Sequence, residues 1–160
     1  MRAHNAIGDS DWSEANLVGA TIITKPHVMA MPTLGTDITL SRLEVIWQTL
    51  TGTSTGGASI DSYEVQYDAN TLGITWTPLQ GQDGSFALAT SVIVNGLSGG
   101  LAYRFRVRAH NDMGWGDFSP EATFYTYDYP DAPTSVTTEY NNMNIKISWV
   151  APATNYKPIT

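Results

Sequence analysis

The strongest alternation of apolar and polar side chains in this chain falls between residues 103 and 109. Tyr103, Phe105, Val107 and Ala109 alternate there with three arginines. Because successive side chains of a β-strand point to opposite faces, this pattern predicts a strand with one buried and one solvated face. An asparagine and a glycine follow, and both residue types favour the turn that ends the strand.

Weaker apolar patterns predict further strands on both sides. Leu43, Val45 and Trp47 share one face of a strand predicted within residues 38–50. Other strands are predicted within residues 60–67, 74–79, 91–94 and 118–127. A loop of Gly, Ser and Thr over residues 51–58 and a turn over residues 81–84 separate them. Short strands with frequent turns over about 100 residues predict an all-β sandwich of seven strands.

Two internal repeats extend the pattern beyond one domain. Residues 2–13 read RAHNAIGDSDWS and residues 108–119 read RAHNDMGWGDFS, so Met1 takes the place of Val107. A second repeat, 102 residues apart, matches Leu43 with Ile145, Val45 with Ile147 and Trp47 with Trp149. A period close to the length of one sandwich predicts tandem domains.

The repeats and the prolines place the domain boundaries. Residues 1–24 are predicted to be the C-terminal strands of one domain, residues 25–127 a complete domain, and residues 128–160 the N-terminal strands of another. Proline at position 26 and the linker DYPDAP from residue 128 mark the two boundaries. A short linker with prolines is expected to restrict the orientation of its neighbours. The last strand of the first domain is predicted within residues 14–24, with apolar positions Leu17, Val18, Ile22 and Ile23.

The segment around the best-defined strand resembles the tyrosine corner of fibronectin type III domains. The matching residues are Leu97, Gly100, Tyr103, Phe105, Val107, Ala109, Asn111, Gly114, Gly116 and Ser119. The chain departs from the family at Gly99, where proline is usual, and this change is expected to loosen the corner slightly. The resemblance implies tandem, immunoglobulin-like sandwiches of seven strands. Their structural motif residues would be Trp47, Tyr63, Leu97, Tyr103, Asn111, Gly114 and Trp149.

Composition and charge argue against several functional classes. The 160 residues hold 8 Lys and Arg against 15 Asp and Glu, a net charge of −7, so a nucleic-acid backbone would be repelled. The absence of cysteine leaves neither disulfides nor thiolate metal ligands. No apolar run approaches the roughly 20 residues that span a bilayer, and no secretory signal follows Met1.

No group of side chains predicts catalysis or a cofactor. His4 and His110 occupy the same repeat position, which indicates a structural role, and no two histidines have metal-ligand spacing. Ser13 and Ser119 stand where the family has a structural serine, without a histidine and an aspartate arranged for nucleophilic catalysis. We therefore expect no enzyme activity, no cofactor and no metal.

The motif Asp9-x-Asp11 is the one candidate for calcium, because carboxylates are the hard oxygen ligands that this ion prefers. The second copy has tryptophan at the first of these positions, which favours a solvated loop instead.

Met113 and Trp115 form the candidate interaction surface. The other copy has Asp9 in place of Trp115, so the fold does not require tryptophan there. A large aromatic side chain beside a methionine in a loop at the domain end is typical of a protein contact surface. The alternative is that Trp115 packs back on its own domain or linker.

These observations predict a structural or adhesive repeat segment of a larger, filament-like or multi-domain protein, extracellular or at the cell surface. Its partners would be proteins, including adjacent copies arranged head to tail. The strands missing from the terminal sandwiches would come either from further sequence or from such copies, in which the N-terminal strands of one copy complete the sandwich begun by Trp149 of another. Two alternatives stay open: a non-catalytic spacer in a secreted enzyme or receptor ectodomain, and an intracellular filament scaffold.

Overall fold

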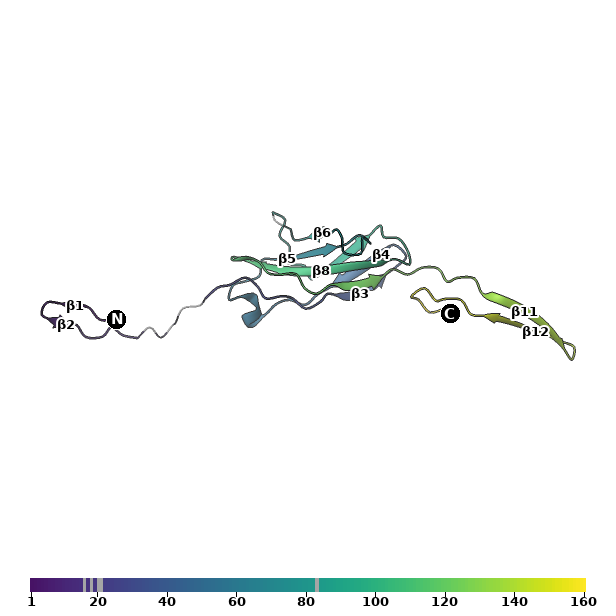
Figure 1. Ribbon diagram of the computed structural model, residues 1–160, viewed down its shortest axis with the longest axis horizontal. Helices are drawn as coiled ribbons and strands as arrows, with labels where there is room; N and C mark the ends of the chain where they lie inside the picture. Colours follow the sequence, from purple (N-terminus) through teal and green to yellow (C-terminus); the bar gives the residue numbers. More distant parts are fainter. Residues whose placement is uncertain (16, 18, 20–21, 83) are drawn as a thin grey trace.

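Two antiparallel sheets packed face to face form the centre of the molecule (Figure 1). The computed structural model describes residues 1–15, 17, 19, 22–82 and 84–160. The smaller sheet has the order β3 (Thr33–Ile38), β4 (Arg42–Ile46), β7 (Ser91–Asn95). The larger has the order β10 (Ala122–Tyr125), β8 (Ala102–Asn111), β5 (Ser62–Tyr67), β6 (Thr77–Gln80), and β9 (Gly114–Trp115) pairs with the end of β8.

The alternation in β8 has the predicted effect. Its four apolar side chains are buried, and the arginines between them are partly exposed. β8 pairs along its length with β5, with Tyr63 opposite Ala109 and Tyr67 opposite Phe105. Together with the other strands of the two sheets, this pairing confirms the all-β sandwich, in which seven strands build the two sheets and the short β9 extends the larger one.

The core lies between the sheets in two clusters. The first consists of Met29, Trp47, Tyr63, Val65, Val107 and Ala109. The second consists of Leu43, Val45, Val94, Leu97, Tyr103 and Phe105. Because burial of one large apolar side chain contributes about 1.5–3 kcal/mol, the matched inner faces of β4, β5 and β8 provide most of the stabilisation.

Tyr103 forms the predicted corner. Its ring is buried, and its hydroxyl oxygen accepts a hydrogen bond from the backbone N–H of Ser98 at 2.8 Å. Leu97 beside it belongs to the same core cluster. The corner therefore has its characteristic bond although Gly99 replaces the usual proline.

The strand predicted over residues 38–50 is shorter in the structure, because β4 covers only Arg42–Ile46. Trp47 follows the strand and is still buried, and its backbone N–H donates to the Thr90 carbonyl oxygen at 3.0 Å. Ile38 belongs instead to β3, a strand that the apolar pattern did not predict. The strand predicted within residues 74–79 is displaced toward the C-terminus, as β6, whereas the strand predicted within residues 118–127 is β10, inside those bounds.

β3 escaped prediction because its alternation is interrupted at a bulge. The pairing of β3 with β4 shifts register between Leu34 and Ile38. Within this stretch the carboxylate of Glu44 accepts hydrogen bonds from the backbone N–H groups of Thr36 and Asp37, at 2.9 and 3.1 Å. A side chain thus takes the place of a strand partner, and the period of two is lost.

The strand predicted within residues 14–24 is wrong for the part of that segment that the structure describes. Residues 14, 15, 17, 19 and 22–24 include no strand, and Leu17 and Ile22 are exposed. Val18 lies outside the described residues. An apolar segment forms a strand only where a neighbouring strand pairs with its backbone groups. Among the described residues of this segment, the backbone of Thr24 bonds to Gly56 and to the Asn111 side chain and not to a strand.

The first repeat instead forms a hairpin of β1 (His4–Asn5) and β2 (Gly8–Asp9). Its register pairs His4 with Asp9 and Asn5 with Gly8. The hairpin of β8 and β9 pairs the equivalent residues, His110 with Trp115 and Asn111 with Gly114. The sequence repeat is therefore also a structural repeat.

A third unit begins with the hairpin of β11 (Thr134–Asn141) and β12 (Asn144–Val150), which lies apart from the sandwich in Figure 1. It corresponds to β3 and β4 of the sandwich. Ile147 and Trp149 are 56% and 59% exposed, whereas their equivalents, Val45 in β4 and Trp47 directly after it, are buried. Within the described ranges, helix is confined to the 3₁₀ turn η1 (Gly52–Thr55), and no helix is long and apolar enough to cross a membrane.

Candidate interaction site

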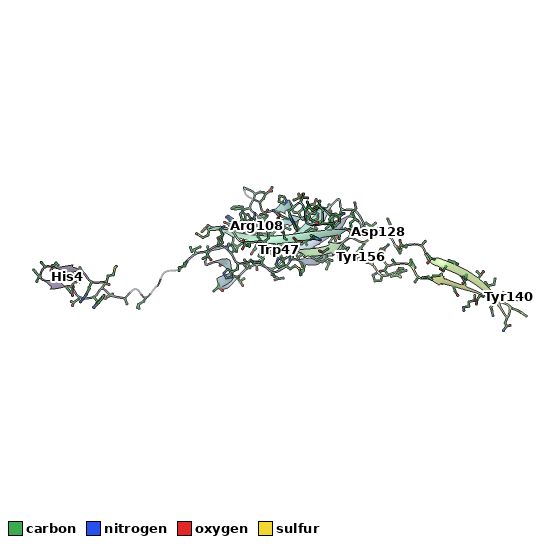
Figure 2. The ribbon with its side chains drawn as sticks, in the orientation of Figure 1. His4, Trp47, Arg108, Asp128, Tyr140 and Tyr156 are labelled. Carbon is green, nitrogen blue, oxygen red and sulfur yellow. The ribbon has the colours of Figure 1, made fainter. Side chains whose placement is uncertain are left out.

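Three arginines project from the outer face of β8. The apolar side chains of this strand point into the core, so Arg104, Arg106 and Arg108 must point away from it. Figure 2 labels Arg108 on the central sandwich. The sequence of one strand therefore places a row of positive charge on the surface of an acidic protein.

Polar side chains of β5 lie directly against this row. Glu64 is buried, and its Oε2 accepts a hydrogen bond from Arg108 Nε at 2.6 Å. Its other oxygen accepts from Gln66 Nε2 at 2.6 Å, and Gln66 Oε1 in turn accepts from Arg106 Nε at 3.0 Å. Both carboxylate oxygens of Glu64 are thus paired, which a buried charge requires.

Three aromatic side chains, from the segment before β6 and the segment after β8, cover the arginines. The guanidinium of Arg106 lies 4.0 Å from the ring centre of Trp76 and 4.1 Å from that of Phe118. The guanidinium of Arg108 lies 4.4 Å from the ring centre of Phe118 and 4.8 Å from that of Trp115. Rings and cations therefore alternate, each pair within cation–π distance. We call this row, Trp76, Arg106, Phe118, Arg108 and Trp115, the arginine–aromatic ladder.

The ladder partly shields Arg106 from water. This burial lowers the pKa of the Arg106 guanidinium, because the charged form loses hydration. The normal pKa of arginine is so high that the side chain is still charged at neutral pH. The ladder is therefore cationic under ordinary conditions.

Trp115 is the last residue of the ladder and lies in β9, beside the end of β8. Its ring centre lies 4.7 Å from that of His110, which in turn lies 4.8 Å from that of Phe86. His110 Nδ1 is 2.7 Å from Asp61 Oδ1. Trp115 thus packs against its own domain, while Met113 in the adjoining turn is 52% exposed.

The N-terminal hairpin repeats this arrangement with a different side chain. Asp9 stands at the position of Trp115, and its carboxylate contacts Arg2 at 2.9 Å and His4 at 2.7 Å. These two residues are the equivalents of Arg108 and His110. Arg2 also lies 5.2 Å from the ring centre of Trp12, the equivalent of Phe118. One position therefore carries either a carboxylate or an indole against the same two partners.

The predicted structural motif residues fall into two groups. Trp47, Tyr63, Leu97 and Tyr103 are in the core. Asn111 is also buried, and its Nδ2 donates to the carbonyl oxygens of Thr24 and Thr55, both at 2.8 Å, which ties the start of the domain to its loops. Gly114 adopts φ = 107° in the turn between β8 and β9. Trp149 alone lies outside the sandwich, on the β11–β12 hairpin.

Sequence analysis missed the ladder, although part of its signal was visible. The arginines at every second position of β8 were recognised only as the solvated side of a strand. Trp76 is distant in sequence, and Trp115 and Phe118 follow the turn after β8, so the alternation within the strand does not reveal them. In the part of the chain that the structure describes, no three His, Cys, Asp or Glu side chains gather as a metal site would require.

Comparison with known proteins gives the chain its family. Residues 32–125 match the model of the fibronectin type III domain. The chain is similar to the protein sax-3 of Caenorhabditis elegans, with 27% identity over 157 residues, which cover 91% of this chain and 12% of that protein. It is also similar to the Kelch domain-containing protein SSO1033 of Saccharolobus solfataricus, with 28% identity over 108 residues, 58% of this chain and 15% of that protein. The chain thus spans a small part of the length of either relative.

A solved structure supports the same fold. The solution structure of a fourth FNIII domain from human superimposes with a TM-score of 0.59 and 21% identity, covering 76% of this chain and 95% of that one. The matched family model covers the two sheets and the tyrosine corner described above. The chain therefore belongs to the fibronectin type III family.

Proposed function

We propose that this chain is a non-catalytic, structural repeat segment that spaces neighbouring domains and makes protein–protein contacts outside the cell or at its surface. Membership of the fibronectin type III family supports an interaction module, and fold alone does not name its partner. The observation that carries the proposal is the uncovered apolar face of β12.

This face has the composition of a sandwich core but is exposed to solvent. Ile145, Ile147 and Trp149 are all more than half exposed. Their equivalents, two in β4 and Trp47 directly after it, pack against β5 and β8 of the larger sheet. Because exposed apolar area of this kind is costly in water, the face is suited to be covered by a protein surface.

An adjacent copy of the chain can supply part of that cover. In the central domain, Val107 and Ala109 share a core cluster with Trp47. Met1 and Ala3 are the repeat equivalents of these two residues, and both are exposed. We therefore propose a head-to-tail contact of Met1 and Ala3 with Trp149 of the next copy. Residues 1–24 contain no equivalents of Tyr63 and Val65, so this contact covers only the Trp149 end of the face.

Sedimentation velocity of the full chain over a range of concentrations tests this contact. The expected result is concentration-dependent association that Trp149→Asp abolishes, because a charge replaces the apolar contact. Ile74→Asp, at an exposed apolar residue of the central domain outside both proposed surfaces, is the matched control and leaves association unchanged. Association that survives Trp149→Asp, or a chain that stays monomeric with Trp149 accessible to a fluorescence quencher throughout, contradicts the head-to-tail contact.

Met113 and Trp115 form a second proposed contact surface. The exposure of Met113 beside the rigid ladder favours it, because a pre-ordered aromatic surface loses little side-chain freedom on binding. If Trp115→Asp weakens self-association and Trp149→Asp does not, the contact lies at this surface instead.

A further inference from the structure

The linker after the central domain lies directly on the tyrosine corner. Thr126 is buried, and its Oγ1 donates to the Ser98 carbonyl oxygen at 2.7 Å. Gly100 N–H donates to the carbonyl oxygen of Tyr127 at 3.2 Å, and Tyr127 N–H donates to that of Thr39 at 3.2 Å. Ser98 also donates its backbone N–H to the Tyr103 hydroxyl. The linker and the tyrosine corner are therefore bonded to the same residue.

This close contact explains the departure from the family at Gly99. A Cβ at position 99 would lie 3.0 Å from the carbonyl oxygen of Tyr127, and one at position 100 would lie 2.8 Å from Asp128 Oδ2. Gly100 also has φ = 70°, where a side chain is strained. Because glycine has no Cβ, the two glycines leave space for the linker to lie against the corner.

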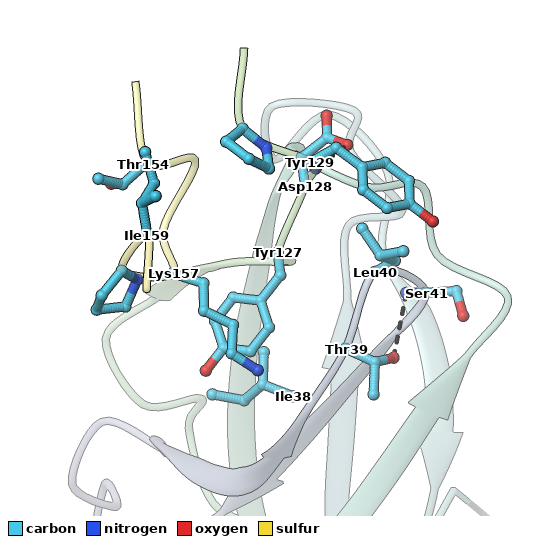
Figure 3. A pocket seen from close by; sticks show the side chains of 12 residues that line it. Ile38, Thr39, Leu40, Ser41, Tyr127, Asp128, Tyr129, Thr154, Lys157 and Ile159 are labelled. Atoms are coloured by element: carbon cyan, nitrogen blue, oxygen red, sulfur yellow. Dashed lines mark hydrogen bonds between the residues drawn. The ribbon is translucent and has the colours of Figure 1, made fainter. Parts of the chain in front are cut away.

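The loop after Trp149 reaches back to the same place. The rings of Tyr125 and Tyr156 stack with centres 4.5 Å apart and planes at 18°. Lys157 Nζ lies 5.1 Å from the ring centre of Tyr127, and Figure 3 shows its side chain extended over that ring. Asp128 N–H donates to the Asn155 carbonyl oxygen at 3.3 Å, and Asn155 Nδ2 donates to that of Tyr129. Residues of the third unit therefore contact the end of β10 and the linker at several points.

The central domain contains an equivalent of one of these contacts. There His27 N–H donates to the Ser54 carbonyl oxygen at 3.0 Å, in the loop after Trp47. His27 precedes Asp128 by 101 residues, and Ser54 precedes Asn155 by the same number. In both units, the loop after the equivalent tryptophan, Trp47 or Trp149, accepts a backbone hydrogen bond from the segment that begins the same unit. In the third unit those first residues are also the linker that is bonded to the corner of the central domain.

We propose that these elements form a fixed joint, made of residues 98–100, 126–129 and 154–157, which holds the third unit at one orientation to the central domain. This inference deepens the proposed spacing function and rests on it. The joint consists of a few contacts around a cavity of about 520 Å³, lined mainly by residues 38–41, 127–130 and 154–159 (Figure 3). Because no packed core fills the cavity, loss of one contact should loosen the joint.

Distance measurement between two spin labels on the full chain tests the joint. The chain has no cysteine, so Ser91→Cys in β7 and Thr138→Cys in β11 provide two unique labelling sites, both exposed. We expect one narrow distance distribution. Lys157→Ser should broaden it at least about twofold, because a short linker without tertiary contacts samples many orientations. Tyr140→Ser at the far end of the hairpin is the matched control and should leave the distribution narrow.

A distance distribution that is already broad in the parent chain contradicts the proposed joint. A narrow distribution that neither Lys157→Ser nor Tyr156→Ser broadens contradicts it as well. Circular dichroism of each variant shows that the strands persist. The Asp128 amide provides a second readout, since its hydrogen exchange should quicken in both variants if the bond to Asn155 depends on the joint. The measurement is made at a concentration where sedimentation shows monomers, so failure of the head-to-tail contact leaves this result interpretable.

Discussion

At the scale of single residues, the hydroxyl of Tyr103 has the most clearly defined task. It accepts the hydrogen bond from Ser98 N–H at the corner where the linker also lies. Tyr103→Phe keeps the ring but leaves this N–H without its partner. We expect a loss of about 1–3 kcal/mol in the free energy of unfolding, measured by urea denaturation. Tyr125→Phe, at an exposed ring, is the control, and an equal loss in both variants would show that the corner bond is unimportant.

Trp115 occupies a position where the fold accepts a carboxylate, as the N-terminal copy shows. Trp115→Asp loses a cation–π contact with Arg108 but places a carboxylate beside Arg108 and His110, as Asp9 lies beside Arg2 and His4. We expect the free energy of unfolding to change by less than about 1 kcal/mol. Phe118→Ala, which empties the space between two arginines, should cost clearly more in the same assay. Equal losses would mean that the ladder depends on Trp115 for stability.

At the scale of elements, the outer faces of β5 and β8 are joined by a buried charge. Glu64 bonds both Arg108 and Gln66 and is almost inaccessible to solvent. Glu64→Gln removes the charge while keeping the shape, so Arg108 loses its partner. The expected loss is about 1–3 kcal/mol by chemical denaturation, since Arg108 is partly solvated and its unpaired charge is partly hydrated.

Glu121 supplies the matched control for this pair. It forms an ion pair with Arg104 on the same face, but both side chains are more than a third exposed. Glu121→Gln should therefore change the free energy of unfolding by less than about 0.5 kcal/mol. A result in which Glu121→Gln costs as much as Glu64→Gln would argue against a special role for burial.

At the scale of the whole molecule, the central sandwich should unfold separately from the two terminal hairpins. Two-stranded hairpins are marginal alone in water, whereas the sandwich has a core enclosed between two sheets. Hydrogen exchange by NMR checks this expectation at equivalent positions, Val45 in β4 and Ile147 in β12. The Val45 amide should be protected to the level of global unfolding, and the Ile147 amide should exchange much faster. Equal protection of the two amides would mean that the chain unfolds as one unit.

The sequence by itself determined the features that depend on local periodicity. Alternation identified β8 and its buried side, because it follows from the two-residue period of a strand. The resemblance of the segment from Leu97 to Tyr103 to the fibronectin type III motif identified the corner. The repeat of residues 2–13 aligned the N-terminal segment with the turn between β8 and β9, and in the structure both segments form a hairpin. These features need only residues that are close together in the chain.

Tertiary structure alone decided which distant side chains meet. Trp76 and Phe118 reach Arg106 only because separate loops close over the outer face of β8. The burial of Glu64 likewise depends on β5 lying beside β8, and β3 depends on a carboxylate from the neighbouring strand. A strand within residues 14–24 failed for the same reason, since an apolar segment becomes a strand only where another strand satisfies its backbone groups.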